Sequence, residues 1–432
     1  MLVCLAVSLL AGCAAASPRN TGTKTVVVVV DGFANWFLDV KGFQLSGFEL
    51  LQRNGVRTEY LLPEFPTVSK PNLFSLLTGL YPSSHNISGN FLFDEQEGQF
   101  VSFEADLKYA ERYCDKSALI WSEAQKEKVV TTLLSWPFCV GINRSIGSSC
   151  TPWTDQADTD LSGRIPEILH KIESPGSQLV MLYYGAVAKL ASLHGPYSGK
   201  TKTAISLIST FLFELQQALS SYELWSTVNL AVVSTHGVAA IEVNNLYFLD
   251  DFLPLDLLHR IVNTGAYMWL YPSDDRDYRI HQSLDAAIPN TKLYWKDKLP
   301  TRWKLSKAPH LAPLLLVARQ GYGIYCRDTS RQFPQASGYV TEDYFPKGLS
   351  GYDNAVPQMK AVFLARGRAF ERAAQVRWLR MVDVYQLLCR IVDIHCGQKD
   401  GSLSRVNALL TAASSRSTAA LSVMLILSAC VL

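Results

Sequence analysis

The chain has 432 residues, of which 48% are hydrophobic and 18% are charged, and its formal net charge is +2. A chain of this size can bury a large core, either as one big α/β domain or as two smaller domains. The nearly neutral charge and the lack of a basic run or a Cys/His zinc-ribbon spacing argue against a nucleic-acid-binding module, so we expect no nucleic acid partner.

The first 17 residues have the pattern of a secretory signal peptide. An apolar run at residues 2–10 is followed by small residues at 14–16, which predicts cleavage near Ser17. Residues 10–13 also resemble a bacterial lipoprotein box, so lipidation at Cys13 is the alternative.

Short apolar runs then alternate with helical patterns through most of the chain. The strand candidates are residues 26–30, 118–121, 179–184, 228–234, 266–271, 314–318 and 360–365. Helical patterns cover residues 48–53, 203–222 and 381–392. This alternation predicts an α/β fold with a mostly parallel sheet and helices on both faces, with residues 272–302 in a small inserted subdomain.

Residues 65–85 contain the strongest candidate for an active site. Ser69 lies just before Pro71, and leucines then recur at helical spacing, so its hydroxyl should lie at a helix N-terminus that favours a phosphate. Asn72 could supply an amide donor to an anionic transition state. A Ser in front of a helix that starts with proline is also typical of an ordinary N-cap.

Six cysteines remain outside the two ends of the chain: Cys114, Cys139, Cys150, Cys326, Cys389 and Cys396. An even number in an exported protein indicates disulfides. Cys139 and Cys150 flank a loop rich in Gly and Ser, so we expect them to pair. Asn86 and Asn143 each begin a glycosylation sequon.

The C-terminal tail has the pattern of a membrane anchor signal. Residues 419–432 are uncharged and mostly apolar, and they follow a polar segment of small residues at 414–418. The apolar run is short for a membrane span, which needs about 20 residues, but it suits a removable glycosylphosphatidylinositol (GPI) signal. We therefore expect an extracellular protein attached to the cell surface through residues 411–432; a frayed or marginally spanning tail is the alternative.

Several motifs together resemble the ectonucleotide pyrophosphatase/phosphodiesterase family of the alkaline-phosphatase superfamily. They are Phe65-Pro66-Thr67, Pro71-Asn72, residues 77–85, residues 351–354 (Gly-Tyr-Asp-Asn), residues 383–389 and residues 401–404. The resemblance runs from about residue 24 to residue 410, which implies one phosphodiesterase-like domain over that range. It also implies a cofactor of two zinc ions and a nucleotide or another phosphodiester as ligand.

In that family one zinc ion is held by the Asp that ends the first strand, the hydroxyl nucleophile and an adjacent Asp-His pair. The matching positions here are Asp31, Ser69, Thr235 and His236. Asp31 and His236 are then vestigial ligands, Ser69 keeps the hydroxyl, and the Asp of the pair is replaced by Thr235.

The second zinc ion of the family is held by an Asp and a His four residues apart and by a further His. The matching positions are Ala188, Ser192 and Ser350, none of which carries an ionisable group. His194 cannot replace the pair, because the residue four positions earlier is Leu190. The resemblance therefore implies that zinc is absent or limited to one ion.

These substitutions favour a catalytically impaired pseudoenzyme that acts by binding a ligand or a partner. Without metal, nothing in the sequence places a general base beside Ser69. The alternative is an active phosphodiesterase with a remodelled metal site and Ser69 as nucleophile. A third possibility is a surface protein that uses the fold only as a display platform.

Overall fold

The computed structural model describes residues 23–103, 112–113, 118–139, 141–173, 176–274, 276–328, 330–331, 345–397 and 399–412. The predicted signal peptide, the lipoprotein box and the anchor segment from residue 413 onward lie outside the described residues, as does Cys114. Within the described ranges, no helix combines the length and the apolar character needed to cross a membrane.

An eight-stranded sheet forms the centre of the larger part of the molecule. Its order is β18-β2-β17-β8-β1-β7-β5-β6, and β17 is the strand that runs against the others. The strands are β1 (Lys24–Val30), β2 (Val56–Leu62), β5 (Thr131–Trp136), β6 (Ser149–Pro152), β7 (Leu179–Tyr184), β8 (Val228–Ser234), β17 (Phe363–Arg366) and β18 (Gln375–Arg380). The predicted α/β fold with a mostly parallel sheet is confirmed.

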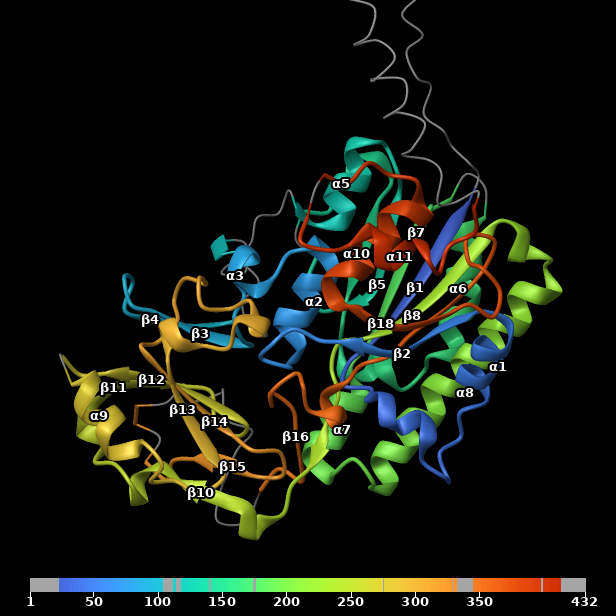
Figure 1. The fold of residues 1–432 in the computed structure, drawn as a ribbon. Coiled ribbons are helices and arrows are strands. Elements are labelled where there is room, and N and C mark those ends of the chain that lie inside the picture. Colours follow the sequence, from blue (N-terminus) through green and yellow to red (C-terminus); the bar gives the residue numbers. More distant parts are fainter. Residues whose placement is uncertain are drawn as a thin grey trace, which may run out of the picture.

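Helices cover both faces of this sheet (Figure 1). The valines of β1 alternate: Val27 and Val29 join the core on one face, and Val26, Val28 and Val30 join the core on the other. The first face is covered by α2 (Ser69–Thr78), α5 (Ile120–Lys126) and α10 (Met381–Val392), and the second by α1 (Ser46–Asn54), α6 (Ile165–Ile172) and α8 (Gly199–Ser221). A strand buried on both sides accounts for the uninterrupted run of valines.

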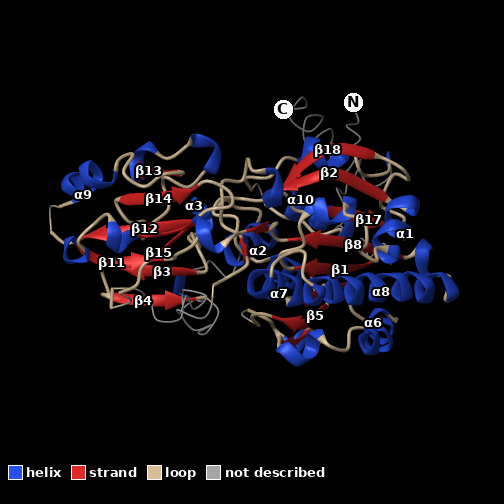
Figure 2. Cartoon of the chain, turned by 90° about the horizontal axis from the view of Figure 1, so that it is seen from below, coloured by secondary structure: helices blue, strands red, loops and turns tan. Residues whose placement is uncertain are grey.

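A smaller antiparallel sheet with its own core lies beside the large one (Figure 2). It contains β11 (Leu258–Val262), β12 (Tyr267–Pro272), β14 (Leu314–Ala318) and β13 (Thr291–Trp295), with α9 (Asp277–Leu284) against β12. The hairpin of β3 (Phe91–Asp94) and β4 (Gln99–Ser102) lies next to β11. Residues 272–302 fall inside this unit, which is larger than the insertion predicted from sequence.

The remaining α-helices and strands are short. They are α3 (Pro82–His85), α7 (Ala186–His194), α11 (Leu403–Asn407), β9 (Ala239–Ala240), β10 (Leu246–Phe248), β15 (Gly323–Tyr325) and β16 (Gly348–Leu349). Of these, α7 and β16 contact each other and carry or adjoin the positions at which metal ligands are substituted.

The predicted strand at residues 118–121 is wrong. Ile120 begins α5, and Ile120, Trp121 and Ala124 bury one face of that helix. A run of four apolar residues suits a short strand and the first turn of a helix equally well, so periodicity could not decide between them. The strand on this part of the sheet is β5, which was not predicted.

Two disulfides are present among the described residues. Cys139 pairs with Cys150, as predicted, and Cys389 at the end of α10 pairs with Cys396. Cys326 is a free thiol buried in the smaller unit. Because burial strongly raises the pKa of the Cys326 thiol, it stays protonated and behaves as a small apolar side chain.

A buried ion pair joins the end of β2 to the start of α10. Glu64 is fully buried, and the Arg380 guanidinium donates to its two carboxylate oxygens at 3.2 and 2.6 Å. Burial raises the pKa of the Glu64 carboxyl, and Arg380 opposes that shift. Asp383, also buried, accepts two hydrogen bonds at 2.7 Å from Arg405 and so fastens α11 to α10.

We predict that Arg380→Met lowers the free energy of unfolding by about 3–5 kcal/mol, because it leaves the Glu64 carboxylate buried without its counter-charge. Chemical denaturation at neutral pH measures the change. Arg377→Met is the matched control, since Arg377 is exposed on the same strand. A loss no larger than that of the control would show that the ion pair does not hold this end of the sheet.

Candidate functional site

Asp31, Ser69 and His236 come together at the carboxyl ends of the central strands. Asp31 follows β1, Thr235 and His236 follow β8, and the parallel register sets Val30 beside Ser234. Ser69 opens α2, and its Oγ lies 2.7 Å from Asp31 Oδ2 and 3.2 Å from His236 Nε2. Parallel sheets gather functional side chains at this edge.

Three hydroxyl groups surround the Asp31 carboxylate, which is only 5% exposed. Its Oδ2 accepts from Ser69 Oγ at 2.7 Å and from Tyr183 Oη at 2.8 Å. Its Oδ1 accepts from Thr235 Oγ1, which itself accepts from the Gly32 backbone N–H at 3.2 Å. A buried carboxylate needs such donors when no cation neutralises it. The hydroxyl of Thr235 therefore helps to stabilise the charge of Asp31.

The His236 ring is oriented by its own backbone neighbour. His236 Nδ1 lies 2.8 Å from the Gly237 carbonyl, which can only accept, so Nδ1 carries a proton. In the neutral ring, Nε2 carries a lone pair and lies 3.2 Å from Ser69 Oγ and 3.5 Å from Asp31 Oδ1. The single hydroxyl proton of Ser69 is donated to Asp31 Oδ2 in this arrangement, and it has to turn towards Nε2 before His236 can accept it. The structure thus supplies the base near Ser69 that the sequence could not place.

The three other substituted positions lie on α7 and directly after β16. The Ala188 N–H donates to the Asp31 carbonyl at 3.0 Å, and α7 packs so closely on Gly32 that a Cβ there would lie 2.6 Å from Ala188 Cα. The Ser192 carbonyl accepts a hydrogen bond from Lys347 N at 2.9 Å. Lys347 directly precedes β16, and Ser350 directly follows it. The side chains at the three positions are a methyl group and two hydroxyls, and their assignment as former ligand positions stays a prediction.

The donor set does not fit a two-zinc centre. Zinc takes three or four N, O or S ligands. One position offers a single carboxylate, a single imidazole and a neutral hydroxyl, and the carboxylate already accepts three hydrogen bonds. The other position offers no ionisable side chain, and the described residues contain no group of three or more His, Cys, Asp or Glu that could hold an ion.

Asn72 does not serve the site as predicted. Its side chain is fully buried, its Oδ1 accepts from Glu64 N at 2.6 Å, and its Nδ2 donates to the carbonyls of Glu64, Pro66 and Val68. The amide is fully used in shaping the turn that leads to Ser69, so no donor is left for a ligand. Asn72 is a structural residue, and its role as an amide donor is corrected.

Asn90 is the amide that lies beside Ser69. It is half-buried, and its Oδ1 accepts from Lys70 N at 3.0 Å, which leaves the Nδ2 group for a ligand. That bond also occupies one of the first N–H groups of α2, and Pro71 has none. The helix end is therefore a weaker anion site than the sequence indicated. Asn90 was missed because no spacing rule connects it with Ser69 across the intervening turn.

Trp153 and Tyr183 form an aromatic wall near Asp31. Their rings meet edge to face with centroids 6.2 Å apart, and Trp153 also packs against Gly185, at the start of α7. Tyr184, the last residue of β7, does not reach Asp31: its hydroxyl donates to the Ala204 carbonyl on α8, whereas the Tyr183 hydroxyl donates to Asp31. Adjacent residues of a strand point to opposite faces of the sheet, so only one of these two tyrosines can reach Asp31.

Asp158 positions this wall. Its Oδ2 accepts from Trp153 Nε1 at 3.2 Å and from Gly185 N at 3.1 Å, whereas its buried Oδ1 has no hydrogen-bond partner among the described residues. Burial raises the pKa of Asp158 to about 7. The carboxyl is thus kept uncharged at mildly acidic pH while it holds Trp153 against α7.

The two predicted glycosylation sites differ in their surroundings. Asn143 is exposed in the loop closed by the Cys139–Cys150 disulfide, and its Oδ1 accepts from Ser145 N and Oγ. Asn86 is half-buried, and its Nδ2 donates to the Tyr113 carbonyl at 3.3 Å. Glycosylation stays a prediction at both, and the accessible amide of Asn143 favours that position.

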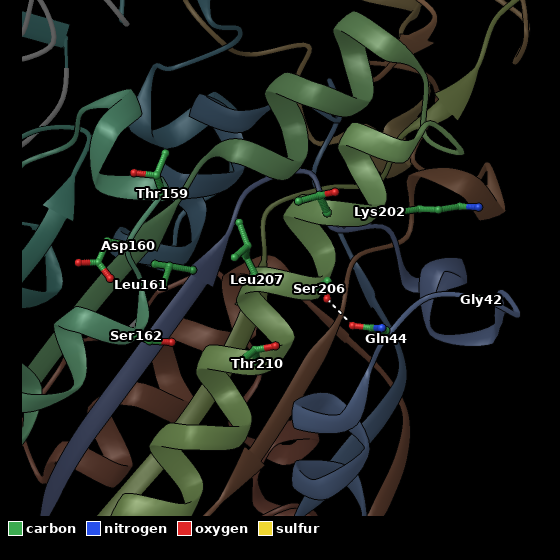
Figure 3. A pocket seen from close by; sticks show the side chains of 11 residues that line it. Gly42, Gln44, Thr159, Asp160, Leu161, Ser162, Lys202, Ser206, Leu207 and Thr210 are labelled. Atoms are coloured by element: carbon green, nitrogen blue, oxygen red, sulfur yellow. Dashed lines mark hydrogen bonds between the residues drawn. The ribbon is translucent and has the colours of Figure 1, made fainter.

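A cavity of about 570 Å³ lies away from this centre, between α8 and the segment from Thr159 to Ser162 (Figure 3). Across it, Ser206 Oγ donates to Gln44 Oε1 at 2.7 Å. No predicted site residue lines it.

Comparisons with known proteins find relatives over most of this chain. The sequence model described as type I phosphodiesterase/nucleotide pyrophosphatase matches residues 25–353. Human ectonucleotide pyrophosphatase/phosphodiesterase family member 5 is 27% identical, with 91% of this chain and 79% of that protein covered. Mouse family member 7 is 23% identical, with 96% of this chain and 93% of that protein covered.

Solved structures show the same fold. The structure of murine ectonucleotide pyrophosphatase/phosphodiesterase 5 matches with a TM-score of 0.79 and 26% identity, covering 90% of this chain and 100% of that chain. An inactive variant of the same murine protein, solved in complex with AMP, matches with the same TM-score, identity and coverage.

We predict that Asp158→Asn removes a pH-dependent loss of stability. The folded-state pKa of about 7 lies above the ordinary value of 3.8 for an aspartate, so the folded protein binds this proton more tightly than the unfolded chain. Stability from Asp158 is then full below about pH 4 and falls by about 2–4 kcal/mol as pH rises to 7. The difference in unfolding free energy between parent and variant, measured from pH 4 to 8, should grow over this window.

Asp155→Asn is the control, because Asp155 is exposed and pairs with Lys189 at the surface. A difference between parent and Asp158→Asn that stays constant with pH would mean that Asp158 is already ionised in the folded protein at pH 4.

Proposed function

The chain belongs to the type I phosphodiesterase/nucleotide pyrophosphatase family, and within it we propose that this protein is a catalytically impaired member that acts by binding a phosphodiester-type ligand. The observation that carries the proposal is the Asp31 centre. There a carboxylate that is a zinc ligand elsewhere in the family is satisfied by the hydroxyls of Ser69, Tyr183 and Thr235.

Loss of the metal ligands removes the main source of rate acceleration. Zinc activates the nucleophile and neutralises charge that develops on phosphoryl oxygens. The side chains that remain beside Ser69 supply one imidazole and one amide, and Asp31 brings negative charge towards an anionic substrate. Electrostatic stabilisation of the transition state is therefore weak.

Binding is better supported than turnover. The half-buried Trp153 offers an aromatic face on which a nucleotide base can stack, and Asn90 Nδ2 can donate to a phosphate oxygen. The AMP complex of the murine relative supports a nucleotide as the first ligand to test. Calorimetric titration of AMP into the parent and into Trp153→Ala would test this pairing, and equal affinity for both would rule out Trp153 as the platform.

A second candidate function is metal-independent hydrolysis with Ser69 as nucleophile. One observation favours it: Ser69 Oγ lies 3.2 Å from His236 Nε2, and the bond from His236 Nδ1 to Gly237 holds the ring in the orientation that a general base requires. Turnover by this route would resist chelators and would disappear in both Ser69→Ala and His236→Gln.

We predict that the purified protein hydrolyses p-nitrophenyl-TMP at least about 10³-fold more slowly than a family member with a complete ligand set, because loss of metal activation costs several kcal/mol of barrier. Steady-state rates with and without added zinc measure this. Zinc-dependent turnover near the rate of the complete enzyme, abolished by Ser69→Ala, would overturn the proposal.

We further predict that zinc binding can be rebuilt in two steps. Thr235→Asp adds a second carboxylate beside His236 and should raise the affinity for one ion, with Thr203→Asp on the exposed face of α8 as the control. Adding Ala188→Asp, Ser192→His and Ser350→His should bring the stoichiometry close to two. Zinc per chain after dialysis is the measurement. A quadruple variant that unfolds like the parent yet binds no more zinc would show that these positions are not the substituted ligand positions.

We also propose that the protein is exported and held at the cell surface by its C-terminal segment. The leader pattern, the disulfides and the apolar tail support this location.

The corresponding prediction is that ending the chain after residue 407 releases a glycosylated protein into the medium of expressing cells, as judged by immunoblotting before and after glycosidase treatment. Sensitivity of the full chain to a phosphatidylinositol-specific phospholipase would support the lipid anchor. Retention of the shortened chain on cells would point to lipidation at Cys13.

A further inference from the structure

A basic pocket lies at the opposite edge of the central sheet from Asp31. It has a volume of about 290 Å³, and we name it the arginine pocket after Arg366, Arg368 and Arg372, which line it together with Asn54, Gly55, Trp225, Gly367 and Phe370. Gly55 precedes β2 and Trp225 lies shortly before β8, so the pocket opens where the parallel strands begin.

The walls of the arginine pocket are held in place by close backbone packing. A Cβ on Gly55 would lie 2.0 Å from the Ala365 carbonyl, and one on Gly367, whose φ is +143°, would lie 2.4 Å from Asn229 Oδ1. That Oδ1 also accepts from Ala369 N at 3.0 Å. The loop that carries the three arginines is therefore fixed against the starts of β2 and β8.

Arg366 is held by an aromatic ring rather than by an acid. Its guanidinium lies 3.8 Å from the centre of the Trp225 ring, and Trp225 Nε1 donates to Ser220 Oγ at 2.9 Å. This stacking leaves the N–H groups at the edge of the guanidinium plane free to bind an anion.

The positive charge of the pocket is not neutralised within the described part of the chain. None of the three guanidiniums forms an ion pair or a hydrogen bond with a described carboxylate, although ion pairs occupy many other arginines, such as Arg327 and Arg405. Burial and the like charge of Arg372 lower the pKa of Arg366. Three cations that meet without a counter-ion favour an anion between them.

The last described residues lie against the same loop. Glu371 N donates to the Leu409 carbonyl at 2.9 Å, and Thr411 N donates to the Ala369 carbonyl at 3.0 Å. The last described residues therefore lie beside the loop that carries the three arginines. The final 14 residues of the sequence are uncharged and mostly apolar. If the C-terminal segment holds the protein at a membrane, as proposed above, this edge of the domain faces the lipid headgroups.

We propose that Arg366, Arg368 and Arg372 bind a phosphate group of the membrane surface, a lipid headgroup phosphate, beside the last described residues. The choice of headgroup over free phosphate rests on the proposed surface attachment. Paired N–H donors of guanidiniums match phosphate oxygens in geometry and charge.

The test uses the full chain in neutral detergent micelles, so it does not depend on how the protein is anchored in cells. Phosphatidylglycerol is added to the micelles, or inorganic phosphate to the buffer, with chloride at equal ionic strength as the reference. The thermal unfolding midpoint is recorded. We expect phosphatidylglycerol to raise the midpoint of the parent by a few degrees, because a ligand that binds only the folded state stabilises it.

The variant Arg366→Gln/Arg368→Gln/Arg372→Gln should lose most of this rise. Arg276→Gln/Arg279→Gln/Arg319→Gln, which removes the same charge from the smaller unit, should keep it. Arg368→Gln alone, at an exposed position, should weaken the apparent affinity about tenfold and serves if the triple variant does not fold. Equal responses of the parent and the arginine-pocket variant would overturn the proposal.

Two further outcomes would also overturn it. If inorganic phosphate reproduces the whole rise and the lipid adds nothing, the ligand is free phosphate. If Ser69→Ala abolishes the rise and the arginine substitutions do not, the anion binds at the Ser69 site. Either result leaves the truncation test of surface attachment unaffected, so the two proposals can fail separately.

Discussion

The arrangement at the carboxyl edge of the sheet depends on a single buried negative charge. Asp31 ends a strand that is enclosed on both faces, so its carboxylate cannot be solvated by water and must be compensated by the protein. Three hydroxyls do this from three different elements, α2, β7 and the end of β8. Because each of those elements is placed by the sheet, the charge is satisfied only when β1, β7 and β8 are in register.

The need to satisfy Asp31 also explains how the fold around the site can be kept although most of the family's metal ligands are substituted. Apart from the Gly32 N–H, which donates to Thr235 Oγ1, the backbone contacts around Asp31 do not involve the substituted side chains. The Ala188 N–H donates to the Asp31 carbonyl, and the Thr67 hydroxyl bonds to the backbone of Gly351 and Tyr352. Small neutral residues at positions 188, 192 and 350 leave these contacts intact. Replacement by Thr235 keeps a polar contact with Asp31, which a purely apolar residue would have lost.

Much of the fold could be predicted from the sequence, because its main strands and helices have hydrophobic patterns that extend over many residues. The valine run of β1 and the helix from Met381 to Val392 carry strong periodicity, and the sequence patterns placed both of them closely. Strands β2 and β18 are mixed in polarity and were not recognised, because they pair at the edge of the sheet and are only partly buried. The disulfide between Cys139 and Cys150 could be predicted because the two cysteines are only 11 residues apart in the sequence.

The site was only partly accessible from sequence. Family positions led to Asp31, Ser69 and His236, but hydrogen bonds between distant segments determine what each group does. The Asn72 side chain carries an amide of the kind that can bind a ligand. Its four hydrogen bonds to nearby backbone groups nevertheless make it a structural residue. Tertiary packing brings Asn90 and Trp153 to the site, and no pattern of spacing in the sequence predicts their positions there.

The direction of the central strands also decides which way this protein faces. The Ser69 centre lies where β1 ends, and the arginine pocket and the last described residues lie where the strands begin. A strand of seven residues is about 23 Å long at about 3.3 Å per residue. A chain held at its C-terminal end would therefore carry its ligand site on the far side of the domain, open to molecules in the surrounding fluid or on an opposing cell and out of reach of lipids in its own membrane.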